Sequence, residues 1–314
     1  MFSNEVKSEY LDSLSMRKRV TAERLFRKTE PIEYKLGLDI GDMNVHELCD
    51  TITACNPQTY IMAFEIRRIF MDYINWRNKR LNISAYNAAE ECNPLSICAI
   101  DDTVKEFRDF NDIYRCLLSV YKATDGMVCF PAACLAWIGL SSDEIAILEP
   151  DDIDFSTGII FVKGRKPSDI IECRQKLPME LLRIYHNTTL GERTQNRSFY
   201  VDLVDVGRFI KVPRTKNSQK ANVPLTGSAI MQTVNTFFCD QYKRLYGKEI
   251  ALTFDGIKML GKINRLEELV RDYGDVNKIP SSKLYGYTQF SKTNWTIQMI
   301  EATLNSFREI HKIH

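Results

Sequence analysis

Apolar and polar positions alternate at helical spacing over residues 1–90. This spacing predicts helices over residues 21–36, where Pro31 could introduce a break, over residues 45–54 and over residues 56–80. Asn56 and Pro57 fit the N-cap and the first position of the third helix. One apolar side of that helix would be formed by Ile61, Phe64, Ile69, Tyr73 and Trp76.

The pattern changes after residue 90. Residues 91–104 lack clear periodicity, contain Pro94 and are expected to form a linker. Beyond them we expect helices at 105–121 and 129–138, a strand at 159–162, a turn at 164–169, a return strand at 170–177, a basic loop region at 189–224 with a strand at 198–203, and helices at 227–246, 253–271 and 288–313. The sequence thus predicts a mostly α protein with a small antiparallel β-sheet, in two domains at residues 1–90 and 105–314.

Composition supports a globular protein. Of the 314 residues, 44% are hydrophobic and 26% are charged, so the chain can bury a core. No apolar run approaches the ~18 residues that a membrane span needs, and the opening residues MFSNEVKSEY lack the pattern of a signal peptide. The nine cysteines are scattered without a CxxC pair, and there are four histidines. We therefore expect no disulfide scaffold, no metal site, no cofactor and a reducing, cytoplasmic location.

The net charge of +1 hides local blocks of charge. Residues 14–28 carry six basic residues and one acidic residue, residues 207–220 carry five basic residues and no acid, and residues 143–154 carry six acids and no base. Such blocks matter more for a polyanionic partner than the total charge does. They indicate either a polyanion-binding surface or solvated faces, and composition alone does not decide between the two.

A more specific pattern covers residues 134–178. Residues 139–144 read GLSSDE, and they are followed by Leu148, by DID at 152–154, by GIIFV at 158–162 and by KLP at 176–178. This order resembles the catalytic domain of the tyrosine recombinases (phage integrases), which reads Gly-Leu-Arg-x-x-Glu, then Leu-x-x-x-Asp-Ile, then a hairpin with a lysine and a Val-Pro-Leu-like run. The resemblance implies a two-domain clamp on DNA, with a helical core-binding-like domain and a catalytic-like domain.

In that family a tyrosine oxygen attacks a DNA phosphodiester. Two arginines bind the non-bridging oxygens, while a lysine and histidines transfer protons. All six corresponding positions differ in this chain. They are Ser141 for the first arginine, Arg165 for the hairpin lysine, Asp255 for the first histidine, Lys258 for the second arginine, Tyr287 for the second histidine and Thr296 for the nucleophile.

These replacements oppose strand cleavage. Loss of one donor to the transition state costs ~10²–10³-fold in rate. Asp255 would place a negative charge beside a phosphate, and the aliphatic alcohol of Thr296 is a poorer nucleophile than a phenol. The sequence therefore predicts a recombinase-like protein without catalytic residues. The alternative is that Tyr287 acts as a shifted nucleophile.

Several of these residues also have ordinary structural interpretations. Ser141 and Glu144 form the Ser-x-x-Glu pattern of a capping box, for a helix at 142–148. Arg165 and Lys166 lie on the hairpin turn, where they would contact a phosphate or only water. Residues 295–314 predict an amphipathic helix, which favours packing against the core over docking on a partner and has an apolar stripe formed by Ile300, Leu304, Phe307 and His311.

Loss of cleavage would leave the DNA-binding surface in place. Basic residues on both domains are candidates for contacts with the DNA backbone, which give salt-dependent affinity but no choice of sequence. The candidates are Arg17, Lys18, Arg19, Arg67, Arg68, Arg77, Lys79, Arg80, Arg165, Lys166, Arg214, Lys216, Lys220, Lys258 and Lys262.

The chain as a whole resembles the lytic-cycle repressors of SPbeta-like Bacillus phages (the MrpR family), which have a tyrosine-recombinase fold with a lost active site. The resemblance implies a sequence-specific transcriptional repressor that maintains lysogeny. It would act in the cytoplasm of a bacterial host, associated with the nucleoid, as a monomer or dimer. Double-stranded operator DNA would be its partner, a regulatory phage protein or peptide a second candidate partner, and no membrane would be involved. The alternatives are a diverged but active integrase and an accessory protein of a recombinase.

Overall fold

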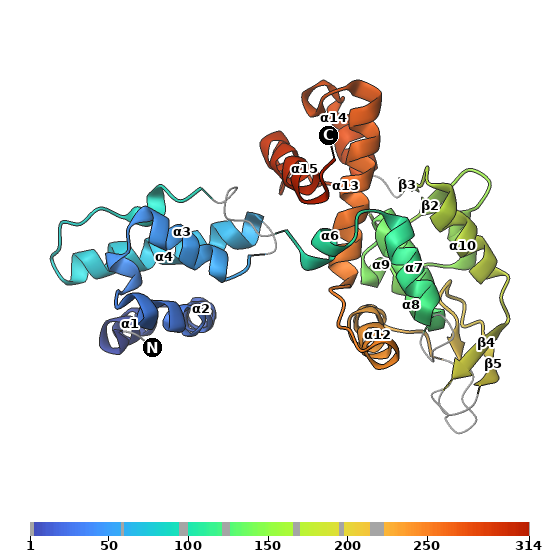
Figure 1. Cartoon of the computed structure of the whole chain (residues 1–314), viewed down its shortest axis with the longest axis horizontal. Coiled ribbons are helices and arrows are strands. Elements are labelled where there is room, and N and C mark those ends of the chain that lie inside the picture. Colours follow the sequence, from blue (N-terminus) through green and yellow to red (C-terminus); the bar gives the residue numbers. More distant parts are fainter. Residues whose placement is uncertain are drawn as a thin grey trace. The chain divides into compact units, whose positions relative to one another are not determined.

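The computed structural model of the protein describes residues 3–57, 60–93, 100–120, 126–165, 170–194, 198–213 and 223–313. It consists of two compact units, Met1–Ile100 and Asp101–His314, and the boundary falls in the segment predicted as a linker (Figure 1). Both units are built mainly from helices, and the strands form small antiparallel sheets, which confirms the predicted fold class. Within the described ranges, no helix combines the length and apolar character that crossing a bilayer requires.

The secondary-structure elements that the structure describes in unit 1 are all helical. Its elements are α1 (Asn4–Asp12), α2 (Met16–Leu36), the short 3-10 turn η1 (Ile40–Asp42), α3 (Val45–Ala54), α4 (Tyr60–Arg80) and the 3-10 turn η2 (Ala88–Glu90). The rings of Tyr10, Phe26 and Tyr73 join α1, α2 and α4, with centroids 5.1–6.0 Å apart. Such tilted aromatic pairs contribute beyond the area that they bury.

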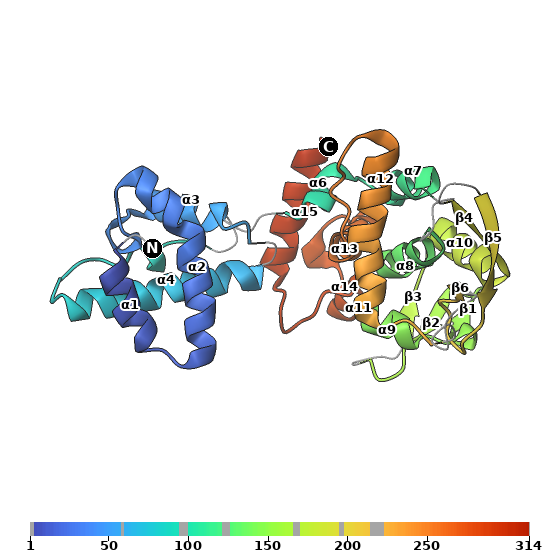
Figure 2. The same ribbon diagram turned by 90° about the horizontal axis from the view of Figure 1, so that it is seen from below.

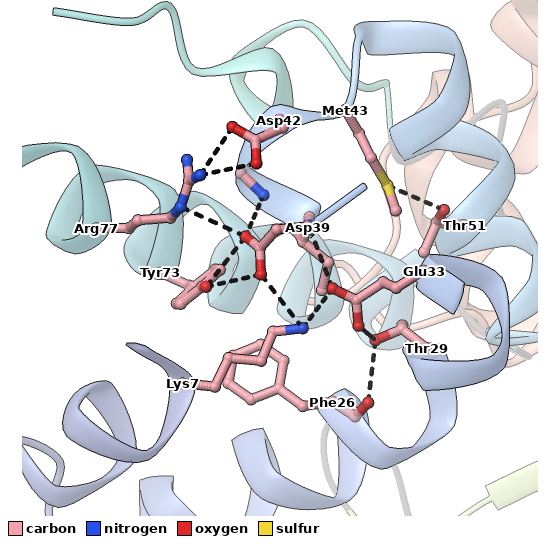
Figure 3. A network of polar contacts seen from close by, with 12 residues as sticks. Lys7, Phe26, Thr29, Glu33, Asp39, Asp42, Met43, Thr51, Tyr73 and Arg77 are labelled. Atoms are coloured by element: carbon pink, nitrogen blue, oxygen red, sulfur yellow. Dashed lines mark hydrogen bonds and ion pairs between the residues drawn. The ribbon is translucent and has the colours of Figure 1, made fainter. Parts of the chain in front are cut away.

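A buried network of charges fixes α1 onto the rest of unit 1 (Figure 3). Lys7 of α1 is completely buried; its ammonium forms an ion pair with Glu33 of α2 and lies 3.5 Å from Asp39. Asp39 also accepts a 3.0 Å hydrogen bond from the hydroxyl of Tyr73 and lies 3.6 Å from Arg77. The backbone N–H of Ile40 donates to Glu33 as well. Each buried charge therefore has a partner, which offsets part of its desolvation cost.

Two local predictions for unit 1 were wrong. Asn56 has a left-handed backbone (φ 51°), whereas a helix N-cap usually has an extended one, and α4 begins only at Tyr60. The buried side of α4 is also shifted from the predicted one: Phe64 is 40% exposed, and the buried residues are Ala63, Ile66, Phe70, Tyr73 and Ile74. Helix α2 continues through Pro31 without ending there.

Unit 2 is organised around one long helix, α13 (Phe254–Tyr273), which packs against α8 (Gly126–Ile138). The two helices approach closely at Gly261, where an added Cβ would lie 2.0 Å from the carbonyl oxygen of Trp137, so only glycine fits. The other helical elements are α6 (Asp102–Glu106), α7 (Phe110–Val120), α9 (Ser142–Ile147), η3 (Pro150–Asp152), α10 (Lys176–His186), α11 (Gly227–Gln232), the π-helical segment η4 (Thr233–Phe238), α12 (Cys239–Tyr246), η5 (Val276–Lys278), α14 (Ser281–Thr288) and α15 (Ile297–His311).

Two small antiparallel arrays complete unit 2 (Figure 2). In the first, β1 (Ile153–Asp154), β2 (Ile159–Phe161) and β3 (Ile170–Glu172) place Ile153, Ile160 and Ile171 side by side on the buried face. The turn between β1 and β2 needs Gly158, because its φ is 74° and a Cβ would lie 2.5 Å from the carbonyl oxygen of Cys173. The second array contains β4 (Leu190–Thr194), β5 (Ser198–Val204) and β6 (Val212–Pro213).

Three predictions for unit 2 need correction. The return strand predicted at 170–177 ends at Glu172, and Lys176 already begins α10, whose first turn tolerates Pro178. The region 189–224 contains β4 and β6 besides the predicted strand, where it was expected to be a loop. The helix predicted at 288–313 begins only at Ile297, as α15 with Thr296 as its N-cap, because the preceding helix α14 ends at Thr288, where Gln289 has a left-handed backbone (φ 64°).

We expect Lys7→Met to lower the free energy of unfolding by about 3–5 kcal/mol at neutral pH, because the buried carboxylates of Glu33 and Asp39 would lose their cation. Burial raises the pKa of Glu33 in the folded protein. A group with a raised pKa gives the folded protein stability that is lost as the pH rises. Without Lys7 this loss becomes larger, so the difference in stability between the variant and the wild-type chain should be smaller at pH 5 than at pH 8. Urea unfolding of the full chain at both pH values measures this.

Arg27→Met is the matched control, because it removes an exposed cation of α2 that pairs with Glu23 at the surface. Its cost should stay below about 1 kcal/mol and should not depend on pH. Equal losses in the two variants would show that the buried network does not anchor α1.

Candidate nucleic-acid interface

Helix α2 carries a row of exposed cations. Arg17, Lys18 and Arg24 are exposed, and their side chains form no ion pair with any residue in the described ranges. Arg17 and Arg24 are seven residues apart and therefore lie on the same side of the helix. A row of free cations on one helix face is suited to bind a polyanion such as a nucleic-acid backbone.

A groove of about 600 Å³ runs beside this row, between α1, α2 and α4. Arg17, Lys18 and Arg68 contribute its cations, and Trp76 contributes an aromatic ring. Its remaining lining residues are Tyr10, Ser13, Leu14, Thr21, Ala22, Glu65, Ile69 and Asp72. The groove therefore combines basic groups with apolar surface, whereas the row on α2 is purely basic.

Other predicted DNA contacts in unit 1 make contacts within the unit. Arg67 donates to the carbonyl oxygens of Ala89 and Glu90, at 2.6 and 2.7 Å, and so ties α4 to η2. Arg77 forms a 2.7 Å ion pair with Asp42 and is 11% exposed. Three exposed ion pairs join the residues Arg19 and Asp12, Arg68 and Glu65, and Arg80 and Glu9. Among the predicted cations of the described part of unit 1, Arg17, Lys18 and Lys79 remain unpaired.

In unit 2, the position expected to hold a hairpin lysine is occupied by Arg165. Its guanidinium lies 2.8 Å from the carboxylate of Glu144, donates to the carbonyl oxygen of Gly139 at 2.9 Å and donates to the side chain of Gln289 at 3.0 Å. Glu144 at the same time receives hydrogen bonds from the backbone N–H and the hydroxyl of Ser141, and it forms the predicted capping box of α9. One carboxylate thus caps a helix and neutralises an arginine.

A second arginine, Arg265 of α13, lies in the same region and is 3% exposed. It donates to the carbonyl oxygens of Trp137 at 2.5 Å, Tyr287 at 3.0 Å and Thr288 at 3.5 Å. These carbonyls lie at the C-terminal ends of α8 and α14, where the helix dipole is negative. Burial lowers the pKa of Arg265 to about 10, so it keeps its charge at neutral pH.

The sequence interpretation missed Arg265 and treated the helix around it only as an element. The only signal was its spacing, because Arg265 follows Lys258 by seven residues and so shares its helix face. Its sequence neighbours include Lys262, Asn264, Glu267 and Glu268, so nothing in the local sequence marked it as a buried charge.

Two lysines of α13 complete this group of cations. Lys258 lies 3.6 Å from Asp255. Asp255 is in the first turn of α13, where its negative charge also interacts favourably with the helix dipole. Lys262 is partly buried, and its ammonium lies 5.4 Å from the ring centroid of Phe290. Burial first, and then the charges of Lys258, Arg265 and Arg165, lower the pKa of Lys262 to about 7. We call these four residues, Arg165, Lys258, Lys262 and Arg265, the α13 cation cluster.

The two hydroxyl groups considered as nucleophiles are engaged elsewhere. Tyr287 is 6% exposed; its hydroxyl donates to Glu268 at 2.5 Å, and the guanidinium of Arg174 lies 4.3 Å from its ring centroid. Burial and Glu268 raise the pKa of Tyr287, which opposes the phenolate form that attack on a phosphate requires. The hydroxyl of Thr296 accepts a hydrogen bond from the backbone N–H of Met299 and caps α15.

Four predicted contacts, Lys166, Arg214, Lys216 and Lys220, lie outside the described residues. The C-terminal helix α15 buries Met299, Ile300, Leu304 and Phe307 within unit 2 and packs against α13, in agreement with the core-packing interpretation. Within the described ranges, no group of three or more His, Cys, Asp or Glu side chains is placed to hold a metal ion.

We expect Lys262→Met to raise the free energy of unfolding, by about 1 kcal/mol at pH 6, because it removes a charge held close to three other cations. The pKa of Lys262 is depressed in the folded protein, so the unfolded chain binds the extra proton and the penalty for folding is largest below pH 7. The gain should therefore shrink as pH rises toward 10. Urea unfolding at pH 6 and pH 9 tests this, with Arg271→Met, which removes an exposed cation in the last turn of the same helix, as the control that should bring no gain.

In the comparison with known proteins, the N-terminal part of the chain matches a family model. Residues 1–79 match the family model described as MrpR, N-terminal core-binding domain. No curated protein matches the chain.

Among solved structures, three similar ones are recombinases. The Tn1549 transposon integrase in complex with circular intermediate DNA is 13% identical, with 95% of this chain and 94% of that chain covered and a TM-score of 0.44. A lambda integrase dimer bound to a COC' core site is 13% identical (99% and 96% covered, TM-score 0.45), and XerA recombinase is 12% identical (99% and 96% covered, TM-score 0.40). The match to the family model confirms the resemblance seen in the sequence: over residues 1–79 this chain is similar to the core-binding domain of MrpR.

Proposed function

We propose that this protein is a DNA-binding transcriptional repressor that maintains the lysogeny of a phage by occupying operator sites, and that it does not cleave DNA. The observation that carries the proposal is a contrast within the described residues. The positions expected to hold catalytic residues contain side chains engaged in caps and ion pairs, whereas the cations of α2 and α13 remain suited to bind phosphate.

The MrpR-type core-binding domain supports the repressor part of the proposal, since the lytic-cycle repressors of this family have a recombinase fold with a lost active site. The integrase complexes named above contain DNA, and this agrees with double-stranded DNA as the partner. Operator choice would come from side chains that reach base edges, and backbone contacts would set affinity and register.

The geometry narrows the set of cations proposed to touch DNA. In unit 1 we assign contacts to Arg17, Lys18 and Lys79, because they are exposed and unpaired, and we add Arg24, which lies on the same face of α2 as Arg17. Arg67 and Arg77 act as scaffold, because their donors are used within the unit. In unit 2 we assign a phosphate contact to Lys262 and Lys258. Burial, and after it the charges of neighbouring cations, lower the pKa of Lys262, and a bound phosphate would offset the repulsion from those cations.

The surroundings of Tyr287 support the proposed absence of cleavage. A nucleophilic phenol must reach a phosphate and lose its proton there. Tyr287 is buried, with the guanidinium of Arg174 over its ring, and its hydroxyl donates a hydrogen bond to Glu268. Ser141 provides no guanidinium, and Arg165 and Arg265 direct theirs at Glu144 and at backbone carbonyls. The two guanidinium groups of this region are therefore already used, and Lys258 and Lys262 are the cations left to meet a phosphate.

We expect the double variant Arg17→Ala/Lys18→Ala to bind operator DNA about 10-fold or more weakly. It should also reduce the slope of log K against log salt by about 1.8, which corresponds to two lost phosphate contacts. Operators found by footprinting in a lysogen supply the DNA, and titration at several salt concentrations gives the slope. Lys35→Ala removes an exposed cation in the last turn of α2 and should change neither quantity. An unchanged slope in the double variant would contradict the assignment of α2.

We expect no covalent protein–DNA adduct when the full chain is incubated with a nicked suicide substrate that contains its operator. Denaturing gel electrophoresis measures the adduct, and an active integrase provides the positive control. An adduct that disappears in Tyr287→Phe or Tyr285→Phe would identify a working nucleophile and would refute the non-enzymatic function. Specific binding without an adduct supports it, whereas equal affinity for operator and random duplex would refute the operator part alone.

A further inference from the structure

Two cysteines of unit 1 lie in direct contact. Cys49 is on α3, and Cys92 lies just after η2, forty-three residues further along the chain. Their sulfur atoms are 3.0 Å apart, and both are free thiols. A disulfide has an S–S distance of about 2.05 Å, so a shift of roughly 1 Å would bring the two sulfurs to bonding distance.

The surroundings give the two thiols different access to solvent. Cys92 is 1% exposed, and its sulfur also lies 3.6 Å from the carbonyl oxygen of Ala88 and 3.8 Å from that of Val45. Cys49 is partly exposed. A small oxidant dissolved in water can therefore reach the sulfur of Cys49 but not that of Cys92, which is buried in contact with Cys49.

The segment that carries Cys92 is held in place by bonds that do not involve either thiol. Arg67 of α4 donates to the carbonyl oxygens of Ala89 and Glu90. The side chain of Asn87 donates to the carbonyl oxygen of Met71 at 3.0 Å and to Asn75 at 2.9 Å. Because these bonds fix the backbone on both sides of Ala88, the approach of the two sulfurs is set by the fold of unit 1 and does not depend on a sulfur–sulfur bond.

We propose that Cys49 and Cys92 form a reversible redox pair that hydrogen peroxide converts into an intramolecular disulfide. The Cys49 thiolate attacks one peroxide oxygen; the O–O bond breaks, hydroxide leaves and Cys49 becomes a sulfenic acid. The sulfur of Cys92 then attacks the sulfur of Cys49 and displaces hydroxide. The two protons from the thiols combine with the two hydroxides, so two thiols are oxidised and one peroxide is reduced to two waters.

The 3.0 Å contact makes Cys92 the resolving residue, and burial makes it a poor first target for peroxide. Burial raises the pKa of the Cys92 thiol, with a further contribution from Cys49, to about 12, so Cys92 stays protonated in the reduced protein. The disulfide would link α3 covalently to the segment that follows η2. The chain between the two cysteines contains the whole of α4. The pair makes unit 1, which carries the proposed DNA contacts of α2, responsive to oxidants. Formation of the disulfide itself is independent of the proposed function.

The test uses the reduced full chain, treated with hydrogen peroxide and then digested under non-reducing conditions. Mass spectrometry should find a peptide pair linked through Cys49 and Cys92, with the loss of two hydrogen atoms, and dithiothreitol should reverse the link. Cys49→Ser and Cys92→Ser should each abolish the linked pair. Cys239→Ser, which removes a partly exposed cysteine of unit 2, should leave it intact.

A trapping measurement keeps the proposal falsifiable if one serine variant folds poorly. Dimedone, which reacts with sulfenic acids, should label Cys49 strongly in Cys92→Ser and only transiently in the wild-type chain. Cys98 lies outside the described residues, so Cys98→Ser is included, and it should retain the Cys49–Cys92 link. The proposal is overturned if no linked pair forms, if the link maps to Cys98, or if Cys49 proceeds to sulfinic acid while Cys92 remains a thiol.

Discussion

The guanidinium of Arg265 is the interaction on which the architecture of unit 2 depends. From the long helix α13, this buried cation donates hydrogen bonds to the carbonyl oxygens of Trp137, Tyr287 and Thr288. It thereby binds the C-terminal ends of two other helices, α8 and α14. Carbonyls at helix C-termini lack partners within their own helices, so the arginine satisfies three backbone groups at once. Removal of this side chain would leave those carbonyls buried without donors.

The same region bears on the proposal of a recombinase-like framework without cleavage chemistry. A catalytic site for phosphoryl transfer keeps cationic donors unpaired until substrate arrives, and this lowers the stability of the free protein. Here Arg165 forms an ion pair with Glu144, and the hydroxyl of Tyr287 donates a hydrogen bond to Glu268. Lys262 retains the opposite character, since burial and neighbouring cations weaken its hold on a proton. The cluster therefore combines scaffold cations with one that would gain from an anionic partner.

Local signals in the sequence predicted local structure well. The capping box of Ser141 and Glu144 needs only four consecutive residues, and the structure contains it as predicted. The mostly helical fold class and the β-hairpin also followed from periodicity. The break between α14 and α15 did not, because it depends on the left-handed backbone of Gln289, a residue held by Arg165 from a distant hairpin. Whether a charge is scaffold or free was likewise hidden: Arg67 and Lys18 look alike in the sequence, and only long-range carbonyl partners distinguish them.

The double role of Glu144 couples two positions that are distant in the sequence. Its carboxylate serves both the cap of α9, through Ser141, and the charge balance of Arg165. An arginine at position 141 would remove the cap hydroxyl and would compete with Arg165 for one carboxylate. A lysine at position 165 would lose the fork that reaches Gly139 and Gln289. Substitutions at positions 141 and 165 should therefore be non-additive in their effect on stability.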